Sequence, residues 1–424
     1  MSIDIQCQER RTADDARGYH SAYFGIERIS LLRNQEKYDN IIAAVASAET
    51  DASSCYQRGK GNGPMQKTFV QTSSKQRAFG PDVVRVLALI LLLWLHFFLR
   101  NGFYYRPVNT TAMTIAAAGR CVFMCCIPLF LMLTGYLKCG KEWKKGYYAG
   151  LFPMLLSWAI VSVICLWYNV CVAGQQKTAW EWLCLFFDFK LANYSWYLEM
   201  YIGLLLVSPF LNMAWNHLQT RRQHTAMVLV FAFLTFLPNT FNGITLDGEH
   251  VLNLLPNYWT SLYFFTYYLI GCWIRTYRPK LNSVICVISA VTVALCFGVI
   301  NRYTGGAEGD FYDGFNISYS HLGTVVISVF LFLGTYRLEC SCAWIRKTMA
   351  VLSGVTLEMY LISCVFDQPL YVLEYGKYGA EQYLSRGLVL TGLVFVGSFF
   401  SGWLIHQISA GVDRWIRSIW ESGV

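Results

Sequence analysis

The sequence predicts an all-α, polytopic membrane protein, and three observations support this fold class. Of its 424 residues, 55% are hydrophobic and only 14% are charged, whereas soluble domains are about 25% charged. The mean hydropathy is +0.37. From Pro81 onward, apolar segments of about 18–25 residues recur, and this length crosses about 30 Å of hydrocarbon. These features exclude a soluble globular domain, a disordered chain, a collagen and a coiled coil.

Residues 1–78 differ in composition from the rest of the chain. They contain 11 Lys/Arg and 9 Asp/Glu and no long apolar run. A secretory signal needs an apolar core segment, so we expect an uncleaved, largely disordered cytoplasmic tail here. Residues 79–424 are expected to form a single membrane domain.

We predict ten membrane-spanning helices, at residues 82–103, 112–137, 147–172, 195–214, 225–241, 258–276, 281–300, 318–337, 347–369 and 387–411. The fifth is short and contains Pro238, which interrupts helical hydrogen bonding. The stretch Thr178–Phe189 is apolar but too short to span, which suits a helix lying at the membrane interface.

The placement of charge supports ten spans with both termini in the cytoplasm. In this arrangement the inner loops and helix ends carry 12 basic residues and two acids, and the outer ones carry seven basic residues and ten acids. Such asymmetry is the positive-inside pattern, and an odd number of spans would break it. The net charge of +8 is thereby explained without a nucleic-acid partner.

A few ionisable residues fall within the predicted spans, where a charge is costly and marks a functional candidate by default. They are Asp82, Arg85, His96, Arg120, Glu199 and Glu358. Arg85 and His96 are 11 residues apart on the first span. In an α-helix this spacing gives a rotation only about 20° past three full turns and a rise of roughly 16 Å. They share one helix face, and Asp82 falls on it too. A local Asp82–Arg85 ion pair and a hydrogen-bonded interhelical His96 are the structural alternatives.

Arg120 and Glu358 are the other two candidates. Arg120 lies in the second span at a depth similar to that of His96, and its structural alternative is an ion pair with Glu199 or Glu358. Glu358 lies near the middle of the ninth span, where it needs a partner or a proton. Glu199 is close enough to an outer helix end to reach the lipid headgroups.

No metal site is expected. The fifteen cysteines contain no CxxC pair, and the close pairs have no neighbouring histidine to complete a zinc site. The remaining histidines, including His406 near the inner end of the last span, are interpreted as structural.

Several blocks of the sequence resemble the acyltransferase-3 family, the integral-membrane O-acyltransferases of surface polysaccharides. Asp82, Arg85 and His96 occupy the positions of the family's D-x-x-R and R-x10-H motifs. The segment from Arg120 to Tyr136 is similar to the family's R…VPLFFMLSGY block, and the segment from Trp196 to Asn212 is similar to its WYL-x-M block. The likeness runs from about residue 79 to 410. Ser363 stands where many members have a histidine.

The resemblance implies transfer of an acyl group, most often acetyl, from cytosolic acyl-CoA to a hydroxyl of a cell-surface glycan or glycolipid. His96 is then the general base or an acyl-accepting nucleophile. Arg85 holds the CoA phosphates, with Asp82 orienting it. Arg120 stabilises the developing negative charge, and Glu358 is a further catalytic candidate. The implied location is the plasma membrane of a bacterium.

Two other functions stay open at this point. A secondary transporter or lipid flippase also uses a charged face within the membrane, although the two halves show no repeat. An export component of polysaccharide assembly is the third possibility. The sequence leaves the acceptor, the acyl chain and the oligomeric state undetermined.

Overall fold

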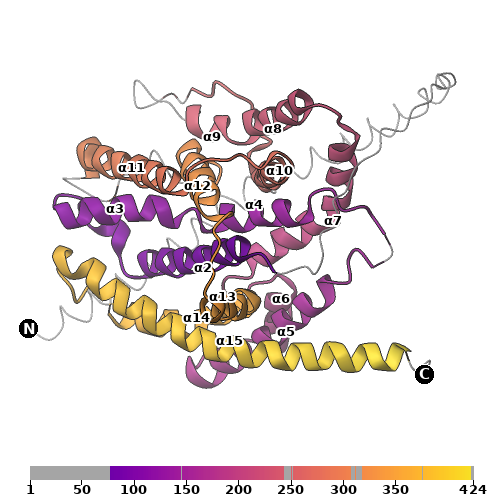
Figure 1. The fold of residues 1–424 in the computed structure, drawn as a ribbon. Helices are drawn as coiled ribbons and strands as arrows, with labels where there is room; N and C mark the ends of the chain where they lie inside the picture. The colour runs from indigo at the N-terminus through magenta and orange to yellow at the C-terminus, as the bar shows by residue number, and fades with distance from the viewer. Residues whose placement is uncertain are drawn as a thin grey trace, which may run out of the picture. The chain divides into compact units, whose positions relative to one another are not determined.

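The computed structural model describes residues 77–144, 146–242, 250, 252–306, 311, 318–374 and 376–421. The regular elements of this part of the chain are all helices, which confirms the predicted all-α class (Figure 1). In chain order the longer ones are α2 (Phe79–Arg100), α3 (Thr111–Phe123), α4 (Cys126–Lys138), α5 (Leu151–Trp167), α6 (Ala179–Phe187), α7 (Trp196–His217), α8 (Arg221–Thr235), α9 (Leu237–Phe241), α10 (Tyr263–Tyr277), α11 (Ser283–Asn301), α12 (Leu322–Thr335), α13 (Ala343–Gly354), α14 (Thr356–Leu373) and α15 (Tyr383–Glu421). Short turns of helix are η1 (Phe103–Tyr105), η2 (Tyr168–Val172), η3 (Thr260–Leu262), η4 (Arg302–Gly306) and η5 (Ala380–Gln382).

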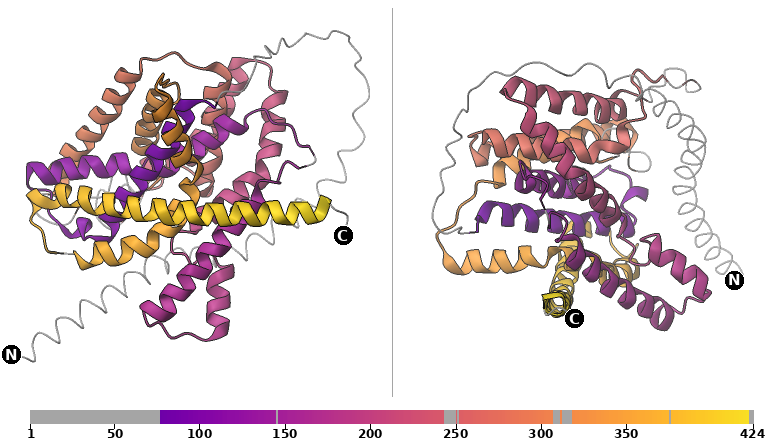
Figure 2. Two further views of the ribbon diagram at one scale, coloured as in Figure 1. Left: turned by 60° about the horizontal axis from the view of Figure 1, so that its bottom comes forward. Right: turned by 90° about the vertical axis from the view of Figure 1, so that its right-hand side faces the viewer.

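Helix α2 occupies the centre of the bundle. It packs against α3 and α4 on one side and against α13, α14 and α15 on the other (Figures 1 and 2). Most of its side chains are buried, as expected for a helix that is apolar on nearly every face and enclosed by others. The candidate residues on α2 are therefore held at the core and not at the lipid surface.

The second predicted span is interrupted in the middle. Helix α3 ends at Phe123 and α4 begins at Cys126, two residues before Pro128. Proline has no N–H to donate and its ring crowds the carbonyl of the preceding turn, so a break at Met124–Cys125 follows from the sequence. The ninth predicted span is divided more sharply, because α13 and α14 meet at a bend of 66° after Gly354.

Helices α4 and α10 cross with their backbones in close contact. A β-carbon added at Gly135 would lie 1.9 Å from the carbonyl oxygen of Tyr268, and one added at Gly271 would lie 2.0 Å from that of Met132. No side chain fits in either place. Small residues at such crossings let membrane helices approach until their backbones pack directly.

Helices α5 and α6 form a hairpin at the edge of the bundle (Figure 2). Helix α5 ends in the π-turn η2, and α6 begins with a capping box in which Thr178 and Glu181 exchange hydrogen bonds. Trp158 of α5 packs on Phe186 and Phe189, with ring centroids 4.6 and 4.3 Å apart. The predicted short helix at Thr178–Phe189 is confirmed, and its place at the membrane interface stays a prediction.

Each predicted span coincides with a helix or a pair of helices, but their lengths differ. Six helices are long and apolar enough to cross a membrane, and the bent pair α13–α14 makes a seventh. Helices α8, α10 and α12 have only 15, 15 and 14 residues. Pro238 ends the fifth segment as a separate short helix, α9. Ten spans and cytoplasmic termini therefore remain predictions.

Part of the charge argument falls outside the described residues. This applies to residues 1–76 of the expected tail and to the outer-loop acids Asp247, Glu249, Glu308, Asp310 and Asp313.

Candidate functional site

His96 lies one turn before the end of α2, where three elements meet. Its side chain is only 7% exposed. Its Nδ1 atom is 3.2 Å from Oδ2 of Asp367 on α14. Its ring stacks on that of Tyr194, just before α7, with a centroid distance of 3.7 Å. The imidazole is thereby fixed from two sides.

Asp367 is the centre of this cluster and is fully buried. Tyr194 donates its hydroxyl to Oδ2 at 2.7 Å. Arg100, at the end of α2, donates Nε to the Tyr194 hydroxyl at 2.8 Å and lies 3.8 Å from Oδ1. A buried carboxylate is tolerated only with such charge and hydrogen-bond compensation. The four side chains therefore form one polar cluster, which we call the His96 cluster (His96, Arg100, Tyr194 and Asp367).

The two nitrogens of His96 have different surroundings. Nδ1 faces the Asp367 carboxylate, although the contact lacks the alignment of a hydrogen bond. Nε2 has no hydrogen-bond partner among the described residues. A carboxylate beside one nitrogen favours the tautomer that leaves the other nitrogen as the proton acceptor. The arrangement suits a general base or a nucleophile acting through Nε2.

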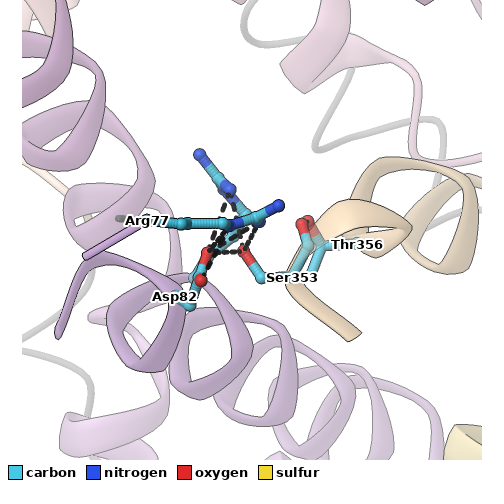
Figure 3. A network of polar contacts seen from close by, with 5 residues as sticks. Arg77, Asp82, Ser353 and Thr356 are labelled. Carbon is cyan, nitrogen blue, oxygen red and sulfur yellow. Dashed lines mark hydrogen bonds and ion pairs between the residues drawn. The ribbon is translucent and has the colours of Figure 1, made fainter. Parts of the chain in front are cut away.

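Asp82 lies at the opposite end of α2, in a second polar network with Arg77 and Ser353 (Figure 3). Arg85 also belongs to this network. Arg77 donates Nε to Oδ2 of Asp82 at 2.8 Å and Nη2 to Oδ1 at 2.7 Å. Ser353, near the end of α13, donates its hydroxyl to Oδ1 of Asp82 at 2.6 Å and accepts Nη1 of Arg85 at 2.8 Å. Asp82 and Arg85 themselves are 3.9 Å apart.

This network adds a second arginine beside Asp82. The expected orientation of Arg85 by Asp82 stays a prediction: the two side chains are 3.9 Å apart, while Arg77 is the bidentate partner of Asp82 and Ser353 connects Asp82 to Arg85. A guanidinium fork matches a carboxylate in this two-bond geometry, so Arg77 occupies the best donor positions.

A cavity of about 390 Å³ begins at Arg85. It is lined by Arg85, Leu92, Phe130, Leu133, Thr134, Leu137, Lys138, Lys141, Met154, Tyr197, Tyr201, Thr356, Leu357 and Tyr360. Three of these residues are cations: Arg85, near the end of α2 that carries Asp82, and Lys138 and Lys141, at and just after the end of α4. The remaining lining is mainly apolar and aromatic. We call it the donor-side cavity. Its volume lies within the roughly 300–1,000 Å³ of small-molecule sites.

The donor-side cavity ends next to the His96 cluster. Tyr360 lines the cavity and donates its hydroxyl to the backbone carbonyl of Tyr194, whose ring lies against His96. Tyr197, also in the lining, packs edge-on against Tyr360 at 5.9 Å between centroids. Tyr360 and Tyr194 thus connect the cavity to the imidazole of His96.

Glu358 belongs to a different contact group. Its Oε1 accepts the hydroxyl of Ser157 at 3.0 Å and lies 3.0 Å from Nδ1 of His406. Glu358 and Asp367 are nine residues apart on α14, roughly 13.5 Å along a helix. His406, which the sequence analysis interpreted as structural, is therefore the partner of Glu358. The structure does not bring Glu358 to His96.

Arg120 is buried in α3 among aromatic rings. Its Nε donates to the Tyr104 hydroxyl at 3.2 Å, and its guanidinium lies 5.6 Å from the centroid of the Tyr104 ring and 5.4 Å from that of Phe311. Because Glu358 bonds to Ser157 and His406, the ion pair between Arg120 and Glu358 is not formed.

Sequence reasoning missed Asp367, Tyr194, Ser353 and Arg77. Asp367 was grouped with the outer-loop acids although it falls inside the predicted span 347–369. Treating every acid within a span as an intramembrane charge would have found it. Ser353 and Tyr194 carry no comparable signal, because hydroxyls are common in membrane helices.

One comparison with known proteins identifies the family of this chain. The family model described as an acyltransferase domain, of the acyltransferase-3 type, matches residues 79–407. The chain belongs to the acyltransferase-3 family. No curated protein and no solved structure matches.

The family assignment, together with the apolar helices, makes the chain a membrane acyltransferase. The blocks that carry the resemblance form the core of this acyltransferase: His96 and Arg85 lie on its central helix, and Gly135 and Gly271 form the α4–α10 crossing. Ser363, where many members have a histidine, is buried and donates its hydroxyl to the Tyr360 carbonyl at 2.8 Å. This bond stays within α14 and gives Ser363 no separate contact with His96.

Proposed function

We propose that this acyltransferase moves an acetyl group from acetyl-CoA to a hydroxyl of a cell-surface glycan or glycolipid. The supporting observation is the donor-side cavity, which has cations at one end and the His96 cluster beyond the other. CoA has phosphates at one end and a thioester at the end of a flexible arm, so its charge distribution matches that of the cavity.

Arg85, Lys138 and Lys141 are the residues we assign to the CoA phosphates. A guanidinium fork and two ammonium groups suit phosphate oxygens. Ser353 and Asp82 position Arg85 for this contact. The cations belong to the predicted cytoplasmic side, so the donor enters from the cytosol of a bacterium whose plasma membrane the ten predicted spans cross.

His96 is the residue we assign to the chemical step. Nε2 takes the proton of the acceptor hydroxyl while its oxygen attacks the thioester carbonyl. The C–S bond then breaks, and the thiolate of CoA takes up the proton from His96. Asp367 stabilises the imidazolium that forms between these events. Acyl transfer through His96 itself uses the same groups in two steps.

Arg120 and Glu358 have no step in this proposal. Arg120 packs between Tyr104 and Phe311, and Glu358 pairs with His406. Both sets of contacts favour a role in holding helices together.

The test uses full-length protein purified in detergent with radiolabelled acetyl-CoA. We expect His96→Ala to lower thioester cleavage roughly 10²–10⁴-fold and Arg85→Gln to weaken acetyl-CoA binding. His217→Ala and Arg222→Gln, two exposed positions outside the site, are the matched controls. Label retained on wild-type protein and absent from His96→Ala would identify the covalent route. A folded His96→Ala protein with full transfer would refute the proposal, and substrate movement without acetyl-CoA consumption would favour a transporter.

A further inference from the structure

A second cavity, of about 210 Å³, lies on the other side of the His96 cluster, between α5, η2, α6 and α14. It is lined by Cys165, Tyr168, Asn169, Gln175, Lys177, Trp182, Leu185, Lys190, Leu191, Asn193, Cys364, Val365 and Gln368. Cys165, Leu191 and Cys364 are buried, whereas Gln175, Lys177 and Lys190 are exposed. The cavity is therefore a pocket with a closed apolar floor and an open polar mouth.

Four carboxamides surround this pocket: Asn169, Gln175, Asn193 and Gln368. None of their side chains makes a hydrogen bond to any residue that the structure describes. Each carboxamide has two donors and an acceptor with two lone pairs, so the four together suit a ligand that carries several hydroxyls. Carboxamides that line a cavity without intramolecular partners are available for such a ligand.

Trp182 supplies the aromatic wall of the pocket. It is half-buried, whereas Trp180 on the same helix is 71% exposed. The capping box at Thr178 and Glu181 fixes the start of α6 at Ala179, three residues before Trp182. An indole beside carboxamides can pack on the apolar C–H face of a sugar ring while the ring's hydroxyls turn to the amides.

The charge at the mouth is positive. Lys190 is neutralised by Asp188 at 2.7 Å. Lys177 has no ion pair within the described part of the chain, and its Nζ lies 6.0 Å from the Trp182 ring. No acid is among the lining residues, so the Lys177 ammonium at the mouth favours a ligand with one anionic group.

The pocket borders the His96 cluster through two adjacent pairs of residues. Asn193 in the pocket precedes Tyr194, and Gln368 follows Asp367. Cys364 lies one helical turn before Asp367 on α14. The pocket and the donor-side cavity have no lining residue in common, and His96 lines neither, so they are two separate spaces that both border the His96 cluster.

We propose that this pocket binds the acceptor, and that the acceptor unit is a single sugar ring carrying a carboxylate or another anionic group. The inference rests on the proposed acyl transfer. The pocket is smaller than the roughly 300–1,000 Å³ of drug-sized sites, which limits its occupant to about one ring. Lys177 selects the anion, Trp182 stacks on the ring, and the carboxamides bind its hydroxyls.

The experiment measures binding of methyl β-D-glucuronide and of methyl β-D-glucoside to the full-length protein in detergent, without acetyl-CoA. Lys177→Gln is expected to weaken glucuronide binding roughly tenfold or more and to leave glucoside binding nearly unchanged. Trp182→Phe is expected to weaken both. Lys280→Gln and Trp180→Phe, exposed residues outside the pocket, are the controls.

Acetyl-CoA binding, measured separately on each variant, distinguishes the two proposals. Wild-type protein that binds acetyl-CoA but neither sugar would overturn the acceptor pocket and leave the proposed function standing. Equal glucuronide affinity in wild type, Lys177→Gln and Trp182→Phe would also overturn it. Sugar binding that responds to both substitutions, in a protein that does not bind acetyl-CoA, would support the pocket and refute the acyl transfer.

Discussion

At the scale of single residues, the site depends on which nitrogen of His96 meets a carboxylate. Asp367 faces Nδ1 at 3.2 Å, and this leaves Nε2 for the substrate. Arg100 and Tyr194 hold the carboxylate in place. A histidine without such a partner would rotate and exchange tautomers.

Asp367→Asn tests this positioning role. The amide has nearly the same size but no charge to stabilise an imidazolium, so we expect turnover to fall roughly 10²–10⁴-fold. Because Asp367 does not line the donor-side cavity, the dissociation constant of acetyl-CoA is expected to stay constant. Steady-state kinetics and equilibrium binding separate the two effects, and equal losses in both would show that the substitution acts on folding.

Ser353→Ala tests the link to Arg85. Its hydroxyl donates to Asp82 and accepts from Arg85, so its loss removes one hydrogen bond to Asp82, which keeps those from Arg77, and frees the guanidinium of Arg85. We expect acetyl-CoA to bind roughly 5- to 100-fold more weakly. Ser363→Ala is the matched control, because the Ser363 hydroxyl bonds only to the carbonyl of Tyr360 in the same helix. Unchanged affinity in Ser353→Ala would remove Ser353 from the donor site.

At the scale of elements, the packing of α2 positions both ends of the site. Helix α2 lies between the α4–α10 pair and the α14–α15 pair. Its His96 end meets α14, and its Asp82 end meets α13. Because α13 and α14 are separated by a bend of 66°, one short stretch of chain supplies partners for both ends of α2.

Gly271→Ala tests the α4–α10 crossing. The added methyl would lie 2.0 Å from the Met132 carbonyl oxygen, so the helices must separate. We expect a loss of about 1–3 kcal/mol in unfolding free energy, as for other overpacked sites. Gly203→Ala on α7 is the control, because a β-carbon there meets nothing within 4 Å. The same stability in both variants, measured by unfolding in detergent, would show that the crossing tolerates a wider spacing.

The stability of the first turn of α6 is expected to depend on pH. Hydrogen bonds from the backbone and hydroxyl of Thr178 hold the pKa of Glu181 below its usual 4.5. A carboxylate whose pKa is lower in the folded state than in the unfolded state stabilises the fold at pH values above its unfolded-state pKa. This stabilisation is lost as the pH falls through the folded-state pKa. The protection factors of the amides of residues 178–182 in hydrogen exchange, which are rates taken relative to the intrinsic rate at each pH, are therefore expected to fall below about pH 4.5. Glu181→Gln cannot titrate and should remove this dependence, and identical profiles for both proteins would exclude the carboxylate as its cause.

At the scale of the whole molecule, the direction of the reaction depends on the topology. Six or seven helices are long enough to span, and charge placement predicts ten spans with cytoplasmic termini. Only with this topology does the donor-side cavity open to the cytosol and the pocket beside α6 to the outside.

Native cysteines test this orientation. Cys184 and Cys342 are both exposed, and ten spans place them on opposite sides of the membrane. In sealed cells, a membrane-impermeant maleimide should label a variant that retains only Cys184. A variant that retains only Cys342 should react only after permeabilisation. Labelling of both from outside would reject the predicted topology.

The sequence by itself determined the helical class, the family and the two ends of the reactive face on α2. These features are local, since hydrophobic length predicts a span and residue spacing predicts a shared helix face. The tertiary structure decided the partners: Asp367 for His96, Ser353 and Arg77 for Asp82, and His406 for Glu358. Arg77 and Asp82 are five residues apart, and the other pairs join residues far apart along the chain. Their distances depend on how helices cross, and crossing is set by packing that no single segment encodes.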